Sequence, residues 1–408
     1  MIAYLWVFLA CAGTTFVATP LVRRLVVRLG AIDQPSDRKV HPKATPTMGG
    51  IAMYAGFLVG LALSRFLPFF SQMNHGSAEP LAALVTCTAM VGLGAIDDKR
   101  GTSALAKLTA QVFIAGLLIL LGVQFVYFWL PGAAIVSVSA DLAVLLTILW
   151  TTLVVNAVNL VDGLDGLAAG MVAIAAAAFF IYMVRSLSIF GEASAAALLS
   201  VITVGICVGF LPWNFHPARI FMGDSGSMLL GMLLTIATIS GVGRNPYPPS
   251  GGDLAAIAGT VLVPLLVLAV PFLDVALAVA RRTWRGQGLG HADKEHIHHR
   301  LMVIGHSHRA AVLLMYLWSA LISGSALAVG LIDGRLAVGA VVLGAVVLFL
   351  VTALPRLVGA RAIVETDPSA ASAGTPGEAA DDAATANPGP AASRTTERAG
   401  IEPSRPAE

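Results

Sequence analysis

The chain has 408 residues, of which 57% are hydrophobic and only 12% are charged, and its mean hydropathy is +0.82. Soluble domains carry about 25% charged residues, so this composition excludes an ordinary soluble protein and indicates a chain embedded in a lipid bilayer. The net charge of +2 gives no reason to expect a nucleic-acid partner. Cys11, Cys87 and Cys207 lie inside apolar runs, and their spacing forms no metal or redox pair, so we interpret them as packed core thiols.

Apolar runs of about 17 to 25 residues, the length that crosses a hydrocarbon core, recur along the whole chain. The expected spans are residues 2–22, 48–70, 80–96, 104–123, 140–156, 166–184, 194–213, 225–243, 255–280, 310–330 and 335–354. The first is interpreted as a retained helix, because no basic residue precedes it and no small-residue cleavage site follows it. The sequence therefore predicts an all-α polytopic membrane protein with eleven transmembrane helices, ten being the alternative count because the fifth run has the shortest apolar length.

Two segments outside the spans have a character of their own. Residues 123–140 contain short alternating runs around Pro131 and Gly132, which predict a small external hairpin. From residue 365 onward the chain is rich in Ala, Pro, Thr, Ser and Glu and cannot bury enough apolar surface to offset its ordering entropy. We therefore expect a transmembrane domain over 1–360 and a disordered C-terminal tail over 361–408.

The basic residues predict the orientation of the chain. Of the 25 Lys and Arg residues, sixteen lie in loops that follow odd-numbered spans, four lie in the other loops and five lie in the tail. Basic loops stay on the cytoplasmic side of a membrane. The N-terminus is therefore predicted to be outside, and the basic loops and the C-terminus are predicted to be cytoplasmic.

Acidic residues collect at the same predicted face. Asp97 and Asp98 end an apolar helix side by side, and adjacent helical side chains diverge by about 100°, so they can contact two different partners, such as a metal and a phosphate. Lys107 follows in the next predicted span and could hold a phosphate as a point charge. The alternative for each carboxylate is an interfacial residue that merely ends a span.

The run from Asn156 to Gly166 combines two amides, two carboxylates and two glycines at the end of the fifth span. Glycine lets the backbone approach a ligand closely, and Asp162 and Asp165 share one face if the segment is helical. Asp-Gly is also a turn signal, so a plain turn between helices is the alternative. The doubled Asp-Gly beside Asn159 favours a binding site.

Asp224 lies in the segment Phe221-Met222-Gly223-Asp224-Ser225-Gly226-Ser227, just before the eighth span. Backbone amides and the helix dipole favour anionic groups at such a helix N-terminus. A carboxylate beside glycines at this place could hold a diphosphate-bound Mg²⁺. An ordinary N-cap residue is the alternative.

Two basic segments complete the predicted face. His296, His298, His299 and Arg300 form the densest part of a histidine-rich loop, and we interpret the histidines as donors to a diphosphate and Arg300 as a donor to a sugar. A Zn²⁺ site and a solvated basic loop are the alternatives. Lys43, Thr45 and Thr47 precede the second span at the level where a lipid phosphate would lie.

Taken in chain order, Asp97-Asp98, the Asn159 to Gly166 run, the Phe221 to Ser227 run and His296-Ile297-His298-His299-Arg300 resemble the polyprenyl-phosphate N-acetylhexosamine-1-phosphate transferases. The likeness extends over residues 20–330. It implies a polytopic helical bundle with a cytoplasmic groove. The His-Ile-His-His-Arg form resembles the branch that uses UDP-N-acetylglucosamine, and the longer likeness is similar to actinobacterial members, for which decaprenyl phosphate is the expected lipid.

The resemblance also implies roles for individual residues. Asp224 would bind Mg²⁺, for which Mn²⁺ could substitute, and Asp97 or Asp98 would assist the lipid phosphate, with Asp165 counted among the catalytic carboxylates. Asn159 and Asp162 would contact the uridine end of the nucleotide sugar. His296, His298 and His299 would assist its diphosphate.

The expected reaction is attack by a lipid phosphate oxygen on the sugar-linked phosphorus of UDP-GlcNAc, which releases UMP and leaves polyprenyl-diphospho-GlcNAc. The expected location is the plasma membrane, with the active site facing the cytoplasm, and the oligomeric state is left open between monomer and homodimer. The alternatives are the related transferase acting on UDP-N-acetylmuramoyl-pentapeptide, a transporter with a carboxylate-lined pathway, and a lipid-binding scaffold without chemistry.

Overall fold

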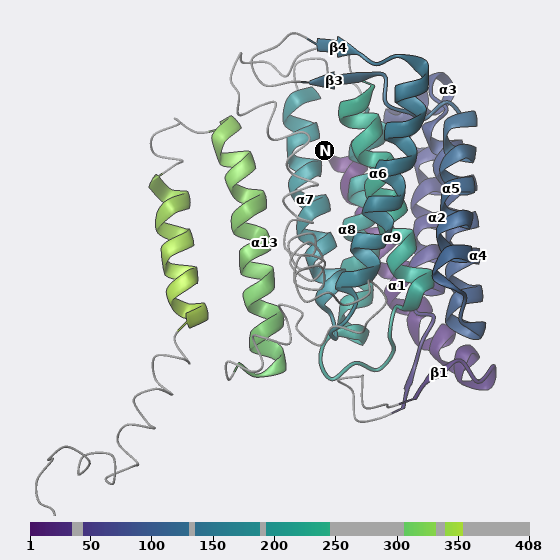
Figure 1. Ribbon diagram of the computed structural model, residues 1–408, viewed down its shortest axis with the longest axis vertical. Coiled ribbons are helices and arrows are strands. Elements are labelled where there is room, and N and C mark those ends of the chain that lie inside the picture. Colours follow the sequence, from purple (N-terminus) through teal and green to yellow (C-terminus); the bar gives the residue numbers. More distant parts are fainter. Residues whose placement is uncertain (35–43, 130–134, 188–192, 245–305, 332–338, 354–408) are drawn as a thin grey trace, which may run out of the picture. The chain divides into compact units, whose positions relative to one another are not determined.

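A computed structural model describes residues 1–34, 44–129, 135–187, 193–244, 306–331 and 339–353 (Figure 1). Its labelled helices are α1 (Ile2–Arg28), α2 (Gly50–Phe66), α3 (Ser71–Gly76), α4 (Glu79–Arg100), α5 (Ala104–Leu120), α6 (Ala140–Val161), α7 (Leu167–Leu187), α8 (Ala195–Asn214), α9 (Gly223–Thr238) and α13 (His308–Leu331). A further helix spans Gly339–Ala353. The strands are β1 (Ile32–Asp33), β2 (Thr45–Pro46), β3 (Tyr127–Trp129) and β4 (Ile135–Ser137).

Helices occupy ten of the eleven expected spans, and the ninth span, 255–280, lies outside the described residues. Among the described helices, five are long and apolar enough to cross a membrane, or six if a bent pair is counted as one span. That bent pair corrects the second expected span, since α2 ends at Phe66 and the chain turns by 87° before Pro68–Gly76. Proline removes a backbone donor and cannot continue a helix, so Pro68 begins a new short element.

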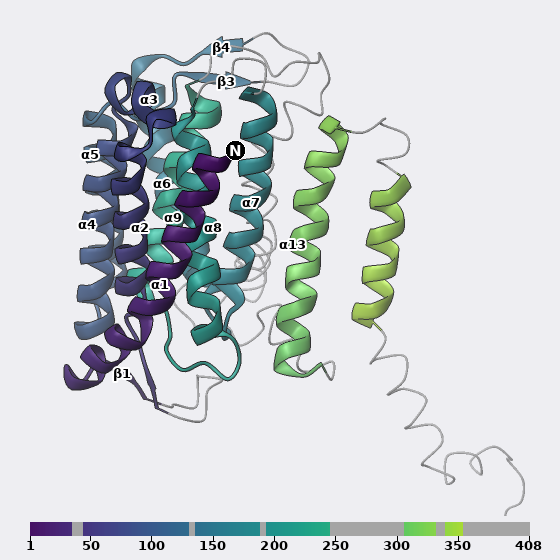
Figure 2. The same ribbon diagram turned by 180° about the vertical axis from the view of Figure 1, so that it is seen from behind.

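The core is built around α8, whose residues are buried over most of its length. Helices α1 and α7 pack on it, and α1 also packs on α2, as Figure 2 shows from behind. A Cβ at Gly209 would lie 2.3 Å from the Ala12 carbonyl oxygen, so the glycine allows α8 and α1 to approach backbone to backbone. Small residues at helix contacts are typical of membrane proteins, where close packing replaces much of the hydrophobic driving force.

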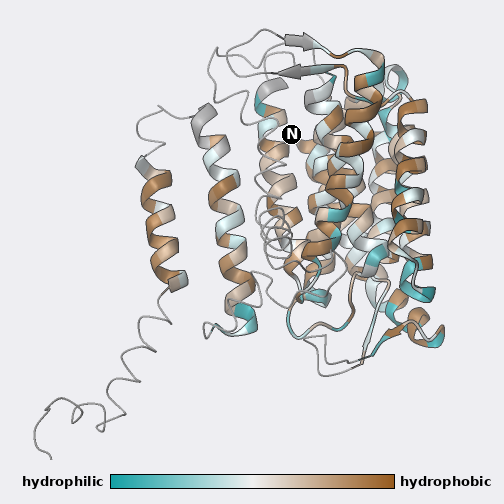
Figure 3. Ribbon diagram, in the orientation of Figure 1, coloured by the Kyte–Doolittle hydropathy of each residue, from teal (hydrophilic) through white to brown (hydrophobic). Residues whose placement is uncertain are grey.

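The two ends of the helices differ. The predicted hairpin is confirmed as β3 and β4, paired antiparallel with Phe128 opposite Val136. At the other end lie β1 and β2, together with the last turns of α1 and α4, where Figure 3 shows hydrophilic residues. Hydrophobic residues cover the middle of these helices (Figure 3). The segments that carry the predicted site residues therefore come together at the end away from the hairpin.

Candidate active site

The N-terminus of α9 is closed by a carboxylate from another helix. Asp98 Oδ1 accepts a hydrogen bond of 2.8 Å from the Asp224 amide, and Asp98 Oδ2 accepts one of 3.1 Å from the Ser225 amide. These two N–H groups have no partner within α9, and the helix dipole favours a negative charge there. The sequence indicated that this terminus favours anionic groups, and in the structure its amides donate to Asp98.

Close backbone packing makes that contact possible. A Cβ at Gly94 of α4 would lie 2.5 Å from the Asp224 carbonyl carbon, so only glycine lets α4 meet α9 at this level. Gly223 has a φ of +69°, and a Cβ there would lie 2.5 Å from Asp98 Oδ1 and 2.6 Å from Thr47 Oγ1. The glycines on both helices thus allow the approach.

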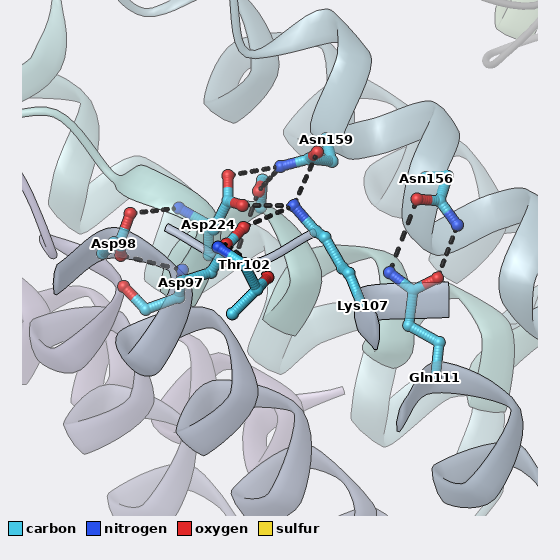
Figure 4. A network of polar contacts seen from close by, with 10 residues as sticks. Asp97, Asp98, Thr102, Lys107, Gln111, Asn156, Asn159 and Asp224 are labelled. Atoms are coloured by element: carbon cyan, nitrogen blue, oxygen red, sulfur yellow. Dashed lines mark hydrogen bonds and ion pairs between the residues drawn. The ribbon is translucent and has the colours of Figure 1, made fainter. Parts of the chain in front are cut away.

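The Asp224 side chain is held from two helices (Figure 4). Asn159 of α6 donates from Nδ2 to Asp224 Oδ1 over 2.7 Å and to Ser227 Oγ over 2.8 Å. Lys107 of α5 donates from Nζ to Asp224 Oδ2 and, over 3.3 Å, to Asn159 Oδ1. Asp224 is therefore a first-turn residue with defined side-chain partners, and α9 has no side-chain cap of its own.

Asp97 points toward the same lysine. Its Oδ2 accepts a hydrogen bond of 2.9 Å from Lys107 Nζ, and its Oδ1 accepts one of 2.6 Å from the Thr102 amide. The side chains of Lys107 and Asp97 are only 15% and 12% exposed, so solvent screens this ion pair less than one at an open surface. The adjacent carboxylates of Asp97 and Asp98 thus contact different partners, which are Lys107 and Thr102 for Asp97 and the α9 backbone for Asp98. Contact with a metal and a phosphate, which the sequence suggested, stays a prediction.

Asp162 lies one residue past the end of α6, beside this cluster. Its burial, and then the negative charges of Asp224, Asp98 and Asp165, raise the pKa of its carboxyl to about 8. We define the carboxylate cluster as Asp97, Asp98, Asp162 and Asp224. Lys107 is the one cation that hydrogen-bonds to this cluster among the residues that the structure describes.

The carboxylate cluster fits a divalent cation. At neutral pH the raised pKa keeps Asp162 largely protonated, so the three carboxylates of Asp97, Asp98 and Asp224 face one ammonium. This excess of negative charge in a largely buried place is unfavourable without further positive charge. Carboxylate and amide oxygens are hard donors, which Mg²⁺ and Mn²⁺ prefer, and one or two carboxylates with phosphate oxygens are the usual ligands of Mg²⁺. Asp224 and Asp97 would hold such an ion if Lys107 turned toward an incoming phosphate.

Asp165 belongs to a second group. Its Oδ2 accepts from the Ala218 amide over 3.0 Å and lies 2.7 Å from His216 Nδ1. Ligand atoms of Asp165, His216 and His308 all lie within 4.8 Å of one another, a spacing that could hold a metal ion. The two imidazole rings are stacked, however, with centroids 4.1 Å apart and planes 20° apart, so in this arrangement their in-plane lone pairs do not converge on one point.

Some of the remaining predicted residues lie in the described part of the chain, and the others lie outside it. Thr45 is buried in β2, and Thr47 lies beside Asp98 and Gly223, which brings the segment before α2 to the edge of the carboxylate cluster. The part of the site predicted at Lys43, His296, His298, His299 and Arg300 lies outside the described residues.

Several contacts were missed by sequence reasoning. The Thr102 hydroxyl donates a hydrogen bond to Asp97, and the Ser227 hydroxyl oxygen accepts one from the Asn159 side chain. Asn214 accepts from the Gly166 amide over 3.1 Å and so fixes the loop that carries Asp162 and Asp165. A signal existed for Ser227, which lies three residues after Asp224 and so on the same helical face.

The fold and the site define a class of protein, namely a multi-pass membrane protein that gathers acidic, amide and lysine side chains at one end of its helices. Within that class the chain belongs to glycosyl transferase family 4, whose family model matches residues 80–242.

Three relatives indicate where in the family it lies. The chain is 41% identical to decaprenyl-phosphate N-acetylglucosaminephosphotransferase of Mycobacterium tuberculosis over 83% of its own length and 85% of the relative. It is 34% identical to a probable undecaprenyl-phosphate N-acetylglucosaminyl 1-phosphate transferase of Bacillus subtilis, over 80% of its own length and 85% of the relative. It is 31% identical to phospho-N-acetylmuramoyl-pentapeptide-transferase of Mycolicibacterium smegmatis, over 80% of its own length and 97% of the relative. The predicted family is confirmed.

Proposed function

We propose that this protein transfers N-acetylglucosamine-1-phosphate from UDP-GlcNAc to a polyprenyl phosphate, decaprenyl phosphate being the expected lipid, with release of UMP. The observation that carries the proposal is the convergence of Asp97, Asp98, Asp162 and Asp224 with Lys107 and Asn159 at one end of the helices. Higher identity to the N-acetylglucosamine relatives, 41% against 31%, supports this donor over the muramoyl-pentapeptide.

The chemistry of the substrates explains why such a cluster is needed. A phosphate monoester has a second pKa of about 6, so the lipid phosphate is mostly a dianion at neutral pH and needs little help from a general base. The larger difficulty is bringing a dianion against a diphosphate, which requires cationic groups fixed in advance. When bound, Mg²⁺ would supply positive charge to the diphosphate oxygens.

The chain's own residues then take separate roles. Lys107 is placed to move from Asp224 and Asp97 to a phosphate oxygen, because its flexible stem carries a compact charge. Asn159 fixes the Asp224 carboxylate, and Asp98 fixes the first turn of α9. Both Asp98 oxygens accept backbone hydrogen bonds, which supports a single displacement over a phospho-Asp98 intermediate.

The donor would lie along the loop after α6. Asp162 and the glycines of this loop support binding of the uridine end, and Asp165 shapes the loop through His216 and Ala218. Thr45, Thr47 and Lys43 are proposed for the lipid phosphate. His296, His298, His299 and Arg300 are proposed for the diphosphate and the sugar, and the active site is proposed to face the cytoplasm at the plasma membrane.

The test is a reconstitution with a choice of donors. Purified protein would be incubated with decaprenyl phosphate, Mg²⁺ and either UDP-GlcNAc or UDP-N-acetylmuramoyl-pentapeptide, and UMP and the lipid-linked product would be measured. We expect both products with UDP-GlcNAc and neither with the pentapeptide donor. UMP release that needs no lipid acceptor, or product formed only from the pentapeptide donor, would overturn the proposal.

A further inference from the structure

Helices α5 and α6 are joined at two successive levels (Figure 4). At the first level Lys107 Nζ donates to Asn159 Oδ1 over 3.3 Å, and both side chains bind Asp224. At the second level Asn156 Nδ2 donates to Gln111 Oε1 over 2.6 Å, and Gln111 Nε2 donates back to Asn156 Oδ1 over 3.4 Å. The second level contacts neither Asp224 nor any other member of the carboxylate cluster in the described part of the chain.

The residue spacing along α5 and α6 makes the hydrogen bonds at the two levels depend on the same register of the two helices. Gln111 follows Lys107 by four residues, and Asn156 precedes Asn159 by three, so each pair lies on one face of its helix. A slip of one residue along a helix moves a side chain by about 1.5 Å and rotates it by about 100°. Hydrogen-bond distances vary by only about 0.5 Å, so a slip at the amide level would remove Lys107 from Asp224.

Burial of the amide pair favours one register of α5 against α6. Gln111 is fully buried, and its partner Asn156 is half-buried. A buried primary amide without a partner is costly where no water can replace the partner, so alternative registers are penalised. A single buried asparagine fixes helix register in coiled coils for the same reason.

We propose that Gln111 and Asn156 are positioning residues, which set the register of α5 against α6 and thereby hold Lys107 at the Asp224 carboxylate. The proposal rests on the transfer reaction proposed above for its kinetic consequence. Its structural consequence, the placement of the Lys107 ammonium, can be measured without turnover.

A purely stabilising pair would behave differently. If the amides only strengthened helix packing, their loss would lower the unfolding temperature but leave the folded enzyme with an unchanged kcat. If they position Lys107, loss of the pair lowers kcat and exposes the lysine, whereas the KM for UDP-GlcNAc changes little, because neither amide touches the proposed donor site.

The experiment compares four variants with the wild type. Gln111→Met and Asn156→Leu remove the amides at nearly constant shape, and the double variant Gln111→Asn with Asn156→Gln reverses the pair at constant summed length. Thr109→Val is the matched control on α5, because Thr109 is exposed and, among the described residues, its hydroxyl bonds only to the Leu105 carbonyl. The measurements are UMP release, thermal unfolding, and the rate at which an amine-reactive acylating reagent modifies Lys107, followed by mass spectrometry.

We expect each single amide variant to lower kcat by between about tenfold and a hundredfold, since a displacement of about 1 Å at a positioned group costs about a hundredfold. Acylation of Lys107 should become faster in both, and the reversed pair should restore both readouts. Unchanged acylation of Lys107 in a folded Gln111→Met protein would overturn the proposal, whether or not the wild type transfers the sugar phosphate. A reversed pair that folds normally yet stays as slow as the single variants would also overturn it.

Discussion

Lys107 is central to the site because it hydrogen-bonds to two carboxylates from different helices. Replacement by methionine keeps most of the length of the side chain and removes its charge. We expect Lys107→Met to lower the transfer rate by at least about a hundredfold, the usual effect of losing one preorganised charge donor. The same variant should unfold at a lower temperature without Mg²⁺, because the carboxylates then lack their cation.

Added Mg²⁺ should recover part of that lost stability but little of the activity, since the ion replaces the charge and not the donor to phosphate. Lys107→Arg is the control that keeps the charge. Activity of Lys107→Met within a few fold of wild type would show that the lysine has no part in transfer.

Asp162 predicts a pH dependence of stability. Its folded-state pKa of about 8 is above the ordinary carboxyl value of 3.8. Between these values the folded state binds more protons than the unfolded state, so this residue lowers the free energy of unfolding as pH rises, and the loss is complete above the folded pKa. Asp162→Asn should therefore unfold at a progressively higher temperature than wild type as pH rises from 5 to 8.5 without Mg²⁺. Parallel curves for the two proteins would contradict this origin of the raised pKa.

At the scale of residues, the sequence located much of the cluster. Asp97, Asp98, Asp224 and Asn159 were predicted as site residues because paired carboxylates, amides and glycines recur in short segments at one predicted face, and the structure brings these four residues together. The sequence could not show which partner each of the adjacent residues Asp97 and Asp98 would contact. Asp98 bonds to the α9 backbone and Asp97 to Lys107, a difference set by the tertiary approach of α4 and α9.

At the scale of elements, the approach of α4 to α9 is the contact on which the site depends. Gly94→Ala would push a methyl group into the backbone at Asp224, at 2.5 Å from its carbonyl carbon. We expect a lower unfolding temperature and at least a tenfold loss of activity, because about 1 Å of displacement at Asp224 is enough for that loss.

Gly92→Ala is the matched control for this prediction. Gly92 lies in the same helix, and a Cβ there would meet nothing within 4 Å. Alanine favours a helix over glycine by about 1 kcal/mol, so this variant should be as active as wild type and no less stable. Equal behaviour of the two alanine variants would show that close packing of α4 on α9 is unimportant.

The elements themselves were largely predictable, since hydropathy marks long apolar helices well, and a mostly helical architecture was confirmed for the described residues. Helix ends were less so. The second apolar run continues past Pro68 with Phe69 and Phe70, yet the chain turns there because proline cannot continue the helix. The count of eleven spans stays a prediction.

At the scale of the whole molecule, the orientation in the membrane can be tested with single cysteines. The native cysteines Cys11, Cys87 and Cys207 are buried, so they should give little background. Ser103 precedes α5 at the proposed cytoplasmic end, and Ser137 lies in β4 at the opposite end; both are exposed. A membrane-impermeant maleimide should label Ser137→Cys in intact cells and Ser103→Cys only after the membrane is opened. The reverse pattern would place the site outside the cell.

The central claim is that Asp224 and its neighbours form a cation-dependent centre for phosphate transfer, and one Mg²⁺ titration tests it most directly. UMP release from UDP-GlcNAc and decaprenyl phosphate would be followed for purified wild type, Asp224→Asn and the Thr109→Val control, with thermal unfolding measured in parallel. We predict saturable dependence on Mg²⁺ for wild type and control, and no release by folded Asp224→Asn at any Mg²⁺ concentration. Substantial Mg²⁺-dependent release by Asp224→Asn would contradict the claim.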